Sequence, residues 1–415
     1  MKEDANFHKR DTCRYCGSKR IKRFLSLGIH PPSNSFLRPD QIQKEKKYPL
    51  ELYICQSCFL VQLIDVVSAA SIFDDYVYLS SSSKALKQHY ADLAQTLTKK
   101  YMLKRGDLVV DIGSNDGILL HGYTLPGIVR VGVEPSKVAE IARSTGLEVI
   151  KDFFTDSTSK KIVKKYGKAK VVTATNVFAH VDDIGSFVKG LPTLLADDGV
   201  FVIEAPYLLD MVDQTLFDII YHEHLCYLSL IPLVPFLARY NLEVFDVNRV
   251  PFGASGPAIR IFVSLKGTRS VEKKVNTLLA YEKTWGVKKM SRYTTFAKQV
   301  AQVKRDMLKK IKKLRASGAR LGGYSAPAKG NTLLNYFGIT TEMLECIAET
   351  NELKQGLLTP GSHIPIVSEE AFLETMPEYA LLLSWNYVDF FLAKSEYIRK
   401  GGKFLVPIPA PVIVP

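Results

Sequence analysis

Two imidazoles, a carboxylate and a phenol stand together near the middle of the chain, as Tyr221-His222-Glu223-His224. Imidazoles and carboxylates are the side chains that most often move protons near neutral pH. If the segment is extended, Tyr221 and Glu223 share one side and His222 and His224 the other. The histidines are not spaced as the paired ligands of a zinc-protease helix. The cluster therefore indicates general acid–base chemistry, and the alternative is a group of hydrogen-bonded surface side chains.

Four of the six cysteines form two Cys-x-x-Cys pairs, Cys13/Cys16 and Cys55/Cys58. Two tight turns of this spacing present four thiolates to one tetrahedral Zn²⁺ ion. Since four thiolates leave no open coordination position, the expected metal is structural. Disulfides do not suit a cytoplasmic chain, which this one is expected to be. The first 65 residues, with strand patterns at 48–54 and 59–63, are expected to form a small β-rich unit around the zinc.

A short apolar run at 108–112 is followed by Gly113 and Gly117, and a second run ends in Glu134. Such runs without helical periodicity are typical of buried parallel strands. The glycines allow a tight turn where a ligand can approach the backbone. In an open α/β sheet the ligand lies beyond the carboxyl ends of the strands, and an acid on the second strand binds ribose hydroxyls.

The glycine turn differs from the G-x-G-x-x-G of dinucleotide sites, because Asp111 stands two residues before Gly113. Asp111 and Asp116 favour a cationic ligand without phosphate. The pattern Asp-x-Gly-x-x-x-Gly, which also contains Asn115, is similar to the S-adenosylmethionine motif of class I methyltransferases. A dinucleotide site and a plain strand–helix turn are the alternatives.

Five strand patterns alternate with helix patterns in this region, at 108–112, 131–134, 148–150, 169–176 and 199–204. This alternation predicts a doubly wound parallel sheet. Asn176 and His180 follow the fourth strand and are expected near the methyl-donor end of the sheet. Phe153 or Phe154, after the third strand, could pack on an adenine ring or in the core.

Four serines at 80–83 precede a helix pattern at 84–100, with apolar residues at helical spacing. One interpretation is that a serine caps this helix. The other is that Tyr76, Tyr78 and the serines form a polar lid over the cofactor strand. The residues themselves do not distinguish these interpretations.

The last third of the chain predicts helices over 270–316 and a second α/β domain, with strands near 320–324, 344–348, 380–386 and 403–406. A turn at 325–330 precedes a helix that is expected to start at Asn331. Lys329 would then lie at a helix N-terminus, where amides and an ammonium group suit phosphate. The alternative is a solvated lysine.

At 415 residues the chain predicts two or three domains. The net charge of +13 favours an anionic partner, although much of it lies in lysine-rich runs at 160–170 and 283–315, which are usually solvated helix faces. No apolar run near the start indicates a signal peptide, and none is long enough for a membrane span. We therefore expect a cytoplasmic protein with no membrane partner.

The cysteine pairs occur together and in order with the motifs at 111–117, 176–180, 221–224 and 323–332. In this combination the chain resembles the nucleotide-sugar C-methyltransferases, which put a branching methyl group on deoxysugars. The resemblance covers nearly the whole chain and implies S-adenosylmethionine and structural zinc as cofactors. It implies three modules: a zinc-binding domain at 1–65, a methyltransferase domain at 66–265 and a Rossmann-like nucleotide-sugar-binding domain at 266–415.

The resemblance also implies roles for the site residues. It makes His224 the base, Tyr221 and Glu223 its partners, and His180 a second active-site histidine. Donor-binding residues are expected to be Asp111, Gly113, Asn115, Asp116, Gly117, Glu134, Phe153, Phe154 and Asn176. Further expected residues are Tyr76 and Tyr78 for the reaction, and Ser81, Ser83, Lys329, Asn331 and Lys354, with Gln355 and Gly356 beside it, for the substrate.

The chemistry fits these residues. A 4-keto group acidifies the neighbouring C3 proton, a histidine near neutral pKa removes it, and the resulting carbon attacks the methyl group. The loop at 253–260 is longer than the Gly-Gly-Ser-Leu-Arg of many family members, so the acceptor sugar can differ from theirs.

Two other functions fit part of the pattern. A zinc-containing RNA or DNA methyltransferase fits the zinc, the sheet and the charge, but the chain lacks an Asn/Asp-Pro-Pro-Tyr/Phe segment. A non-enzymatic binding module would leave the cluster at 221–224 without a purpose. We therefore expect a monomeric enzyme with a nucleotide-diphosphate sugar substrate and no nucleic-acid partner.

Overall fold

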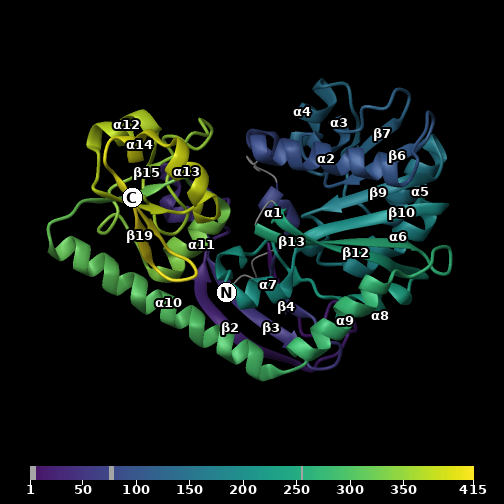
Figure 1. Ribbon diagram of the computed structural model, residues 1–415, viewed down its shortest axis with the longest axis horizontal. Coiled ribbons are helices and arrows are strands. Elements are labelled where there is room, and N and C mark those ends of the chain that lie inside the picture. The colour runs from purple at the N-terminus through teal and green to yellow at the C-terminus, as the bar shows by residue number, and fades with distance from the viewer. Residues whose placement is uncertain (1–5, 74–78, 254–255) are drawn as a thin grey trace. The chain divides into compact units, whose positions relative to one another are not determined.

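The computed structural model describes residues 6–73, 79–253 and 256–415 (Figure 1). Internal contacts divide the chain into two compact units. Unit 1 comprises Met1–Lys22, Tyr53–Asp210 and Leu225–Lys289, and unit 2 comprises Arg23–Leu52, Met211–His224 and Met290–Pro415. Three of the five boundaries fall within β2 (Ile21–His30), β3 (Tyr48–Cys55) and α7 (Leu208–Asp213). The three modules expected from the sequence stay a prediction.

Unit 1 contains a seven-stranded sheet in the order β12-β13-β10-β9-β6-β7-β8. The strands are β6 Leu108–Ile112, β7 Val129–Val133, β8 Glu148–Ile150, β9 Ala169–Thr175, β10 Leu195–Pro206, β12 Leu242–Gly253 and β13 Gly256–Leu265. The five strands from β6 to β10 are parallel, and β13 is antiparallel to both β10 and β12. This is the class I methyltransferase arrangement, so the predicted fold class is confirmed.

The order of the strands determines where a ligand can bind. Strands β7 and β8 extend the sheet on one side of β6, whereas β9 and β10 extend it on the other. The order in which successive strands are added to the sheet therefore reverses between β6 and β9. Ligands of open α/β sheets bind beyond the carboxyl ends of the strands at such a reversal. The turn after β6 and the loops after β7 and β9 meet this condition.

The two antiparallel strands β12 and β13 were not predicted from the sequence. In β12 a buried carboxylate, Asp246, interrupts the apolar pattern that identifies a strand. It is tolerated because Lys100 and Lys274 approach its two oxygens at 2.5 and 2.6 Å. These two lysines come from distant parts of the sequence, so the pattern alone does not reveal the compensation.

The helices of unit 1 follow the predicted periodicity. The helix α2 spans Lys84–Lys100, as predicted, and Ser83 caps it by accepting a hydrogen bond from the amide of Leu86. Its buried residues are Leu86, Tyr90, Leu93, Ala94 and Leu97. Burying one such side chain contributes about 2 kcal/mol. The other helices here are α1 Ala69–Phe73, η2 Ser80–Ser82, α3 Ile118–His121, α4 Val138–Ser144, α5 Asp156–Tyr166, η3 Phe178–His180, α6 Ile184–Leu194, α8 Leu230–Ala238 and α9 Lys273–Trp285.

Short strands surround the cysteine pairs. Strand β1 (Phe7–Lys9) pairs with β5 (Asp65–Val67), and β4 (Val61–Leu63) pairs with β11 (Cys226–Tyr227), both antiparallel. A strand was predicted over 59–63, but Phe59 has a left-handed φ of 71°. That backbone conformation belongs to the turn of the second cysteine pair, so the strand begins two residues later.

Unit 2 contains a six-stranded sheet in the order β16-β15-β14-β17-β18-β19, so the second α/β domain expected from the sequence is present. Only β19 is antiparallel to its neighbour. The strands are β14 Leu321–Tyr324, β15 Ile347–Ala348, β16 Ile366–Val367, β17 Tyr379–Leu382, β18 Lys403–Val406 and β19 Val412–Val414. The helices are η1 Pro39–Lys44, η4 Phe217–Ile219, α10 Met290–Ala316, α11 Ala328–Phe337, α12 Glu369–Thr375, η5 Trp385–Tyr387, α13 Val388–Lys394 and α14 Glu396–Arg399.

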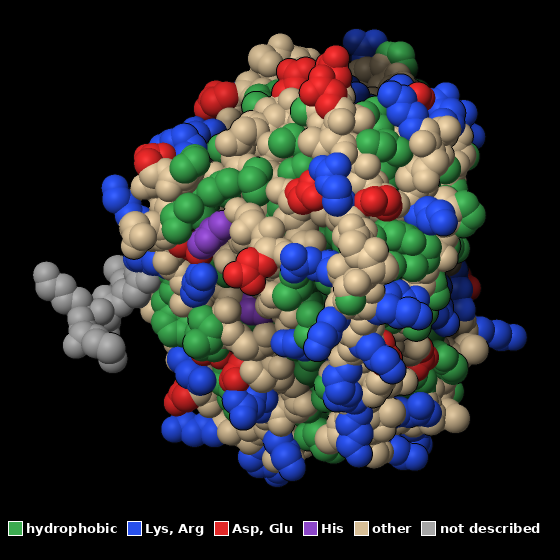
Figure 2. Space-filling model, turned by 90° about the vertical axis from the view of Figure 1, so that its left-hand side faces the viewer, with side chains coloured by type: hydrophobic (Ala, Val, Ile, Leu, Met, Phe, Trp, Pro, Cys, Tyr) green, Lys and Arg blue, Asp and Glu red, His purple; other side chains and the backbone are tan. Residues whose placement is uncertain are grey.

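Most residues of the two lysine-rich runs lie on helices and expose their basic side chains, as expected. In the first run most lysines pair with carboxylates, for example Lys160 with Asp156 and Lys161 with Asp152. In α10 the apolar side is buried and most of the basic side chains are exposed. Figure 2 shows Lys and Arg side chains gathered over the lower part of one face of the molecule. In the described parts of the chain, no helix is both long enough and apolar enough to cross a membrane.

Candidate active site

The glycine turn after β6 is packed too closely for any larger residue. Gly113 has a φ of 69°, and a Cβ atom there would lie 2.3 Å from the Val177 side chain. Gly117 has a φ of 81°, and a Cβ atom would lie 2.1 Å from the side chain of Leu147. Both glycines are therefore favoured by their left-handed conformation, and Gly113 is in addition closely packed against Val177. The turn holds its backbone against the loop after β9, at the edge where the sheet order places a ligand.

This packing predicts the effect of one methyl group. Replacing Gly113 with alanine is expected to lower the free energy of unfolding by about 3 kcal/mol, because a left-handed backbone costs about 1 kcal/mol and overpacking costs about 1–3 kcal/mol. Gly146 is the control, since it has a φ of 86° and open space where a Cβ atom would lie. Gly146→Ala should lose only about 1 kcal/mol. If urea unfolding shows equal losses of unfolding free energy in the two variants, Gly113 is not closely packed against Val177.

The acid at the end of β7 holds the backbone of the glycine turn. Glu134 is buried, and its carboxylate accepts hydrogen bonds from the amides of Asn115 and Ser136, at 3.0 and 2.9 Å. The carboxylate is thus oriented from two sides at the carboxyl end of its strand. This position suits recognition of ribose hydroxyls, and that role of Glu134 stays a prediction.

The serine run lies on the glycine turn. The backbone amide of Ser80 donates to the side chain of Asn115, and that of Ser81 donates to Asp116, both at 2.9 Å. Ser83 caps α2, whereas Ser80 and Ser81 contact the candidate cofactor turn. Tyr76 and Tyr78 lie outside the described residues, and the roles predicted for them and for Ser81 and Ser83 stay predictions.

Asp111 is a buried residue of β6 whose carboxylate accepts a hydrogen bond of 2.6 Å from the Thr173 hydroxyl on β9. Burial raises the pKa of Asp111 to about 7, although that hydrogen bond by itself lowers the pKa. The side chain therefore joins the two strands at the reversal point of the sheet. Direct contact of Asp111 with a cationic donor stays a prediction.

The two phenylalanines after β8 have different surroundings. Phe154 is buried, and its ring lies 5.1 Å from that of Phe187, edge to face. This is core packing, one of the two alternatives considered. Phe153 is 45% exposed and keeps a face that an adenine ring could cover.

A charged cluster that the sequence did not predict lies at the carboxyl ends of β9 and β10. The Glu204 carboxylate is buried between His89 and Arg260, at 2.6 Å from each. Nearby, the Asn176 side chain donates to the Tyr90 hydroxyl at 3.2 Å. Burial alone would raise the pKa of Glu204, but the hydrogen bond from His89 and the charge of Arg260 lower it below the usual value. The cluster fixes α2 to the sheet beside the predicted donor residue Asn176.

Removal of this carboxylate should destabilise unit 1. Glu204→Gln leaves the Arg260 guanidinium without its anion, so we expect a loss of about 3 kcal/mol at pH 7. Because the folded-state pKa is lowered from 4.5, the stabilisation is complete above pH 4.5 and disappears as pH falls through the lower folded value. In urea unfolding, the difference in free energy of unfolding between wild type and Glu204→Gln should be smaller near pH 3 than at pH 7. The exposed Glu140→Gln variant is the control, and an equal effect there would refute the cluster's role.

The segment 221–224 in unit 2 is a turn, not an extended strand, because the His224 amide bonds to the Tyr221 carbonyl at 2.9 Å. The Tyr221 and His224 rings consequently lie against each other, with centroids 3.9 Å apart and planes tilted by 35°. Tyr221, His222, Glu223 and His224 are all buried. The alternative of a surface cluster is therefore wrong.

The environment of His224 makes it a neutral imidazole. Its Nδ1 lies 2.6 Å from the carbonyl oxygen of Ile219. A carbonyl oxygen only accepts, so Nδ1 carries the proton and Nε2 the lone pair. Burial lowers the pKa of His224 to about 4. A proton-accepting nitrogen is therefore present throughout the neutral pH range.

The neighbouring Glu223 is bound by a residue from a distant part of the sequence. Both of its carboxylate oxygens lie 3.0 Å from the side-chain nitrogen of Asn34. Burial raises the pKa of Glu223 to about 7, although this hydrogen bond by itself lowers the pKa. A carboxyl group with this pKa can hold or release a proton near neutrality. His222 instead faces the Pro49 carbonyl at 3.3 Å, and burial lowers its pKa to about 4.

Two lysines are buried around the first turn of α11. The helix starts at Ala328, three residues earlier than expected, so Lys329 lies within its first turn. Lys329 contacts Asn386 and lies 5.0 Å from the Trp385 ring, so the alternative of a solvated lysine is wrong. Burial lowers its pKa to about 8, whereas the charge of Asp218 raises it.

Further contacts complete this part of unit 2. The Lys354 ammonium donates to the Ala326 carbonyl at 2.8 Å and lies 4.8 Å from the Phe36 ring. Asn331 donates to the Ser33 carbonyl at 2.7 Å. Trp385 donates to the buried carboxylate of Asp218 at 2.6 Å. Sequence analysis missed Asn34, Phe36, Asp218 and Trp385, because each is recognisable only through its partner.

The four paired cysteines of unit 1 meet at one point. Their sulfur atoms all lie within 4.8 Å of one another, and Cys13 and Cys55 are buried. Tetrahedral zinc–sulfur bonds of about 2.3 Å place sulfur atoms about 3.8 Å apart. The donor set and its spacing therefore fit a structural Zn²⁺ ion. Cys226 and Cys346 are buried elsewhere.

Three protein-family models match successive parts of the chain. Residues 13–73 match a model described as "Putative zinc binding domain". Residues 83–247 match a methyltransferase domain, and residues 254–409 match the C-methyltransferase C-terminal domain. The matches follow one another without overlap and leave few residues unassigned.

One relative is similar over nearly the full length. The C-methyltransferase NovU of Streptomyces niveus is 33% identical over 408 residues, which are 97% of this chain and 97% of that protein. Solved structures with partial likeness include an S-adenosylmethionine-dependent methyltransferase from Clostridium acetobutylicum (16% identity, 44% of this chain and 92% of that chain, TM-score 0.35). Another is the magnesium protoporphyrin IX methyltransferase from Synechocystis (13% identity, 43% of this chain and 78% of that chain, TM-score 0.32).

Proposed function

The chain belongs to the family of S-adenosylmethionine-dependent C-methyltransferases, and from that premise we propose that its acceptor is a nucleotide-linked 4-keto-6-deoxyhexose methylated at C3. The observation that carries the proposal is the surroundings of His224. A neutral imidazole with its proton on Nδ1 packs against the ring of Tyr221 and is adjacent to Glu223, whose pKa burial raises to about 7. A keto sugar needs such a base, because its carbon is not nucleophilic until a proton is removed.

We assign proton removal to Nε2 of His224. The Ile219 carbonyl holds the ring in the tautomer that has its basic lone pair on that nitrogen. The Tyr221 hydroxyl and the protonated form of Glu223 are hydrogen-bond donors suited to the oxygen of a forming enolate. His180 is assigned as a second active-site histidine, and Tyr76 or Tyr78 as a further participant.

The donor residues are assigned on the carboxyl edge of the sheet in unit 1. Gly113, Asn115 and Gly117 shape the turn, and Glu134 is assigned to the ribose hydroxyls. Asp111, Asp116 and Asn176 complete the polar set, and Phe153 is assigned to the adenine. When bound, S-adenosylmethionine supplies an electrophilic methyl group on a sulfonium. The close packing of Gly113 and the oriented carboxylate of Glu134 support this assignment.

We assign the nucleotide diphosphate to the first turn of α11 with Lys329 and Lys354. Two buried ammonium groups in one small region suit an anionic ligand, and a helix N-terminus adds amides that favour phosphate. Asn331 and the serines Ser81 and Ser83 are assigned to further substrate contacts. The net charge of +13 agrees with an anionic substrate.

Loss of one ammonium group should weaken substrate binding. For Lys329→Ala we expect KM for the nucleotide sugar to rise about 10- to 100-fold, because hydrogen bonds to charged groups contribute about 1.5–3 kcal/mol. Since burial lowers the pKa of Lys329 to about 8, the wild-type KM should also rise above pH 8, as the ammonium loses its proton. The variant should not show that rise. The exposed Lys312→Ala serves as the control, and the same KM increase there would exclude a specific role.

The function is tested with labelled methyl donor and a panel of nucleotide-linked 4-keto-6-deoxyhexoses. Label in the sugar, located at C3 by NMR, is the expected result. Transfer to RNA and to none of the keto sugars would overturn the proposal in favour of a nucleic-acid methyltransferase. Methylation at another carbon would refute the C3 assignment alone.

A further inference from the structure

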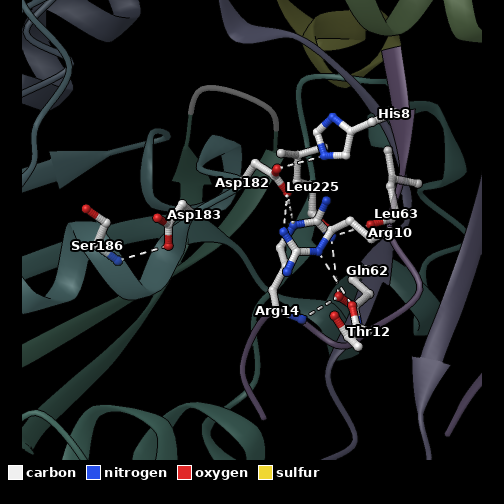
Figure 3. A network of polar contacts seen from close by, with 10 residues as sticks. All are labelled: His8, Arg10, Thr12, Arg14, Gln62, Leu63, Asp182, Asp183, Ser186 and Leu225. Carbon is white, nitrogen blue, oxygen red and sulfur yellow. Dashed lines mark hydrogen bonds and ion pairs between the residues drawn. The ribbon is translucent and has the colours of Figure 1, made fainter. Parts of the chain in front are cut away.

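An arginine inside the first cysteine pair is buried against the loop that carries His180. Arg14 stands between Cys13 and Cys16, and its side chain has no exposed surface. Its Nε donates to the Asp182 carboxylate at 3.1 Å (Figure 3). Its Nη1 contacts the Leu63 carbonyl, and lies 3.3 Å from the Gln62 side-chain oxygen. A fully buried guanidinium with this many fixed partners has a single conformation.

Two arginines and one histidine contact the carboxylate of Asp182. The Arg10 guanidinium donates to the same oxygen as Arg14, at 3.0 Å, and His8 lies 3.0 Å from the other oxygen. Asp182 is only two residues from His180. The next residue, Asp183, caps α6 by accepting from the Ser186 amide at 3.1 Å. The chain on the C-terminal side of His180 is therefore held by side-chain contacts.

The N-terminal side of His180 is held through the backbone. The Ala179 carbonyl accepts from the Leu225 amide at 2.8 Å, and the Leu225 carbonyl accepts from the Leu63 amide at 3.0 Å. The same Leu225 oxygen lies 3.4 Å from Nη1 of Arg14. Arg14 thus contacts both of the segments that flank His180.

We propose that Arg14 and Asp182 are positioning residues that couple the cysteine module to His180. The inference rests on the proposed function in giving His180 a part in the reaction. In this arrangement the cysteine pairs hold Arg14, Arg14 holds Asp182, and Asp182 fixes the η3 segment that presents the imidazole. Small displacements of a reacting group can cost about 100-fold in rate, so the coupling acts on kcat more than on donor binding.

The test compares Arg14→Gln, Asp182→Asn and the double variant in the full-length, zinc-loaded enzyme. We expect kcat to fall about 10- to 100-fold, with zinc content and donor affinity unchanged. The double variant should be no worse than the poorer single variant, because the two residues act as one unit. Arg14→Lys should recover part of kcat by restoring the charge. Arg20→Gln is the control, since Arg20 is exposed and donates to the Gln56 carbonyl instead of to Asp182.

Hydrogen exchange gives a readout that does not depend on the substrate. Peptides covering 177–182 should exchange about tenfold faster in Arg14→Gln than in wild type, and no faster in Arg20→Gln. Unchanged exchange in these peptides would overturn the inference, even if no keto sugar is methylated. Multiplicative losses in the double variant, or a kcat loss matched by lost zinc, would also overturn it. If exchange is faster in Arg14→Gln but the enzyme methylates none of the sugars, the coupling is correct and the proposed acceptor is wrong.

Discussion

The variant His224→Ala is expected to lower kcat by about 10³- to 10⁴-fold, which is the upper range for the loss of a general base. The Nδ1 contact with Ile219 leaves Nε2 as the proton acceptor, and alanine removes that acceptor without adding bulk. Burial lowers the pKa of His224 to about 4, so the wild type should keep its base down to pH values near 4. The loss in the variant should therefore be similar at pH 6, 7 and 8. Calorimetry should show nearly unchanged donor affinity, because the residues that we assign to the donor lie in unit 1.

The neighbouring histidine provides the control for this experiment. His222 is buried like His224, with its pKa also lowered to about 4, but it faces the Pro49 carbonyl. His222→Gln should affect stability more than kcat. Near-normal turnover of His224→Ala would remove His224 from the base role. A second readout is exchange of the C3 proton with deuterated solvent in the absence of methyl donor, which His224→Ala should abolish.

Loss of one zinc ligand is expected to have the largest effect on stability. Cys55→Ser should reduce the zinc content from one ion per chain to nearly none. Structural zinc binds with about 10 kcal/mol or more at pH 7 in small zinc-binding peptides, and that free energy supports the folded cysteine turns. Cys55 is buried, with its sulfur 3.6 Å from that of Cys16, so no outside group can replace it. Metal analysis and thermal unfolding measure the two effects.

Cys346→Ala is the control for the zinc experiment. Cys346 is buried in unit 2 and is not one of the four clustered cysteines. This variant should keep one zinc ion per chain and lose only the contribution of a small core side chain. If Cys55→Ser retains its zinc, the assignment of Cys55 as a ligand is wrong. Wild-type protein without zinc, whose four thiols titrate freely, would refute the metal site itself.

The sequence by itself determined the local elements of this protein. Helix α2 matches its prediction from Lys84 to Lys100, because apolar periodicity and a serine cap are properties of neighbouring residues. The five parallel strands and the glycine turn were likewise predicted from short runs. The spacing of the cysteine pairs was enough to predict that four sulfur atoms meet.

Tertiary structure alone decided which distant residues meet and what is buried. Glu223 meets Asn34 across 189 positions, and Asp218 meets Trp385 across 167. Such contacts depend on how elements pack, and no periodicity encodes them. The burial of Lys329 and the turn at 221–224 were missed for the same reason. A side chain's desolvation, and with it the pKa that suits it to chemistry, is a property of the packed fold and not of its neighbours in sequence.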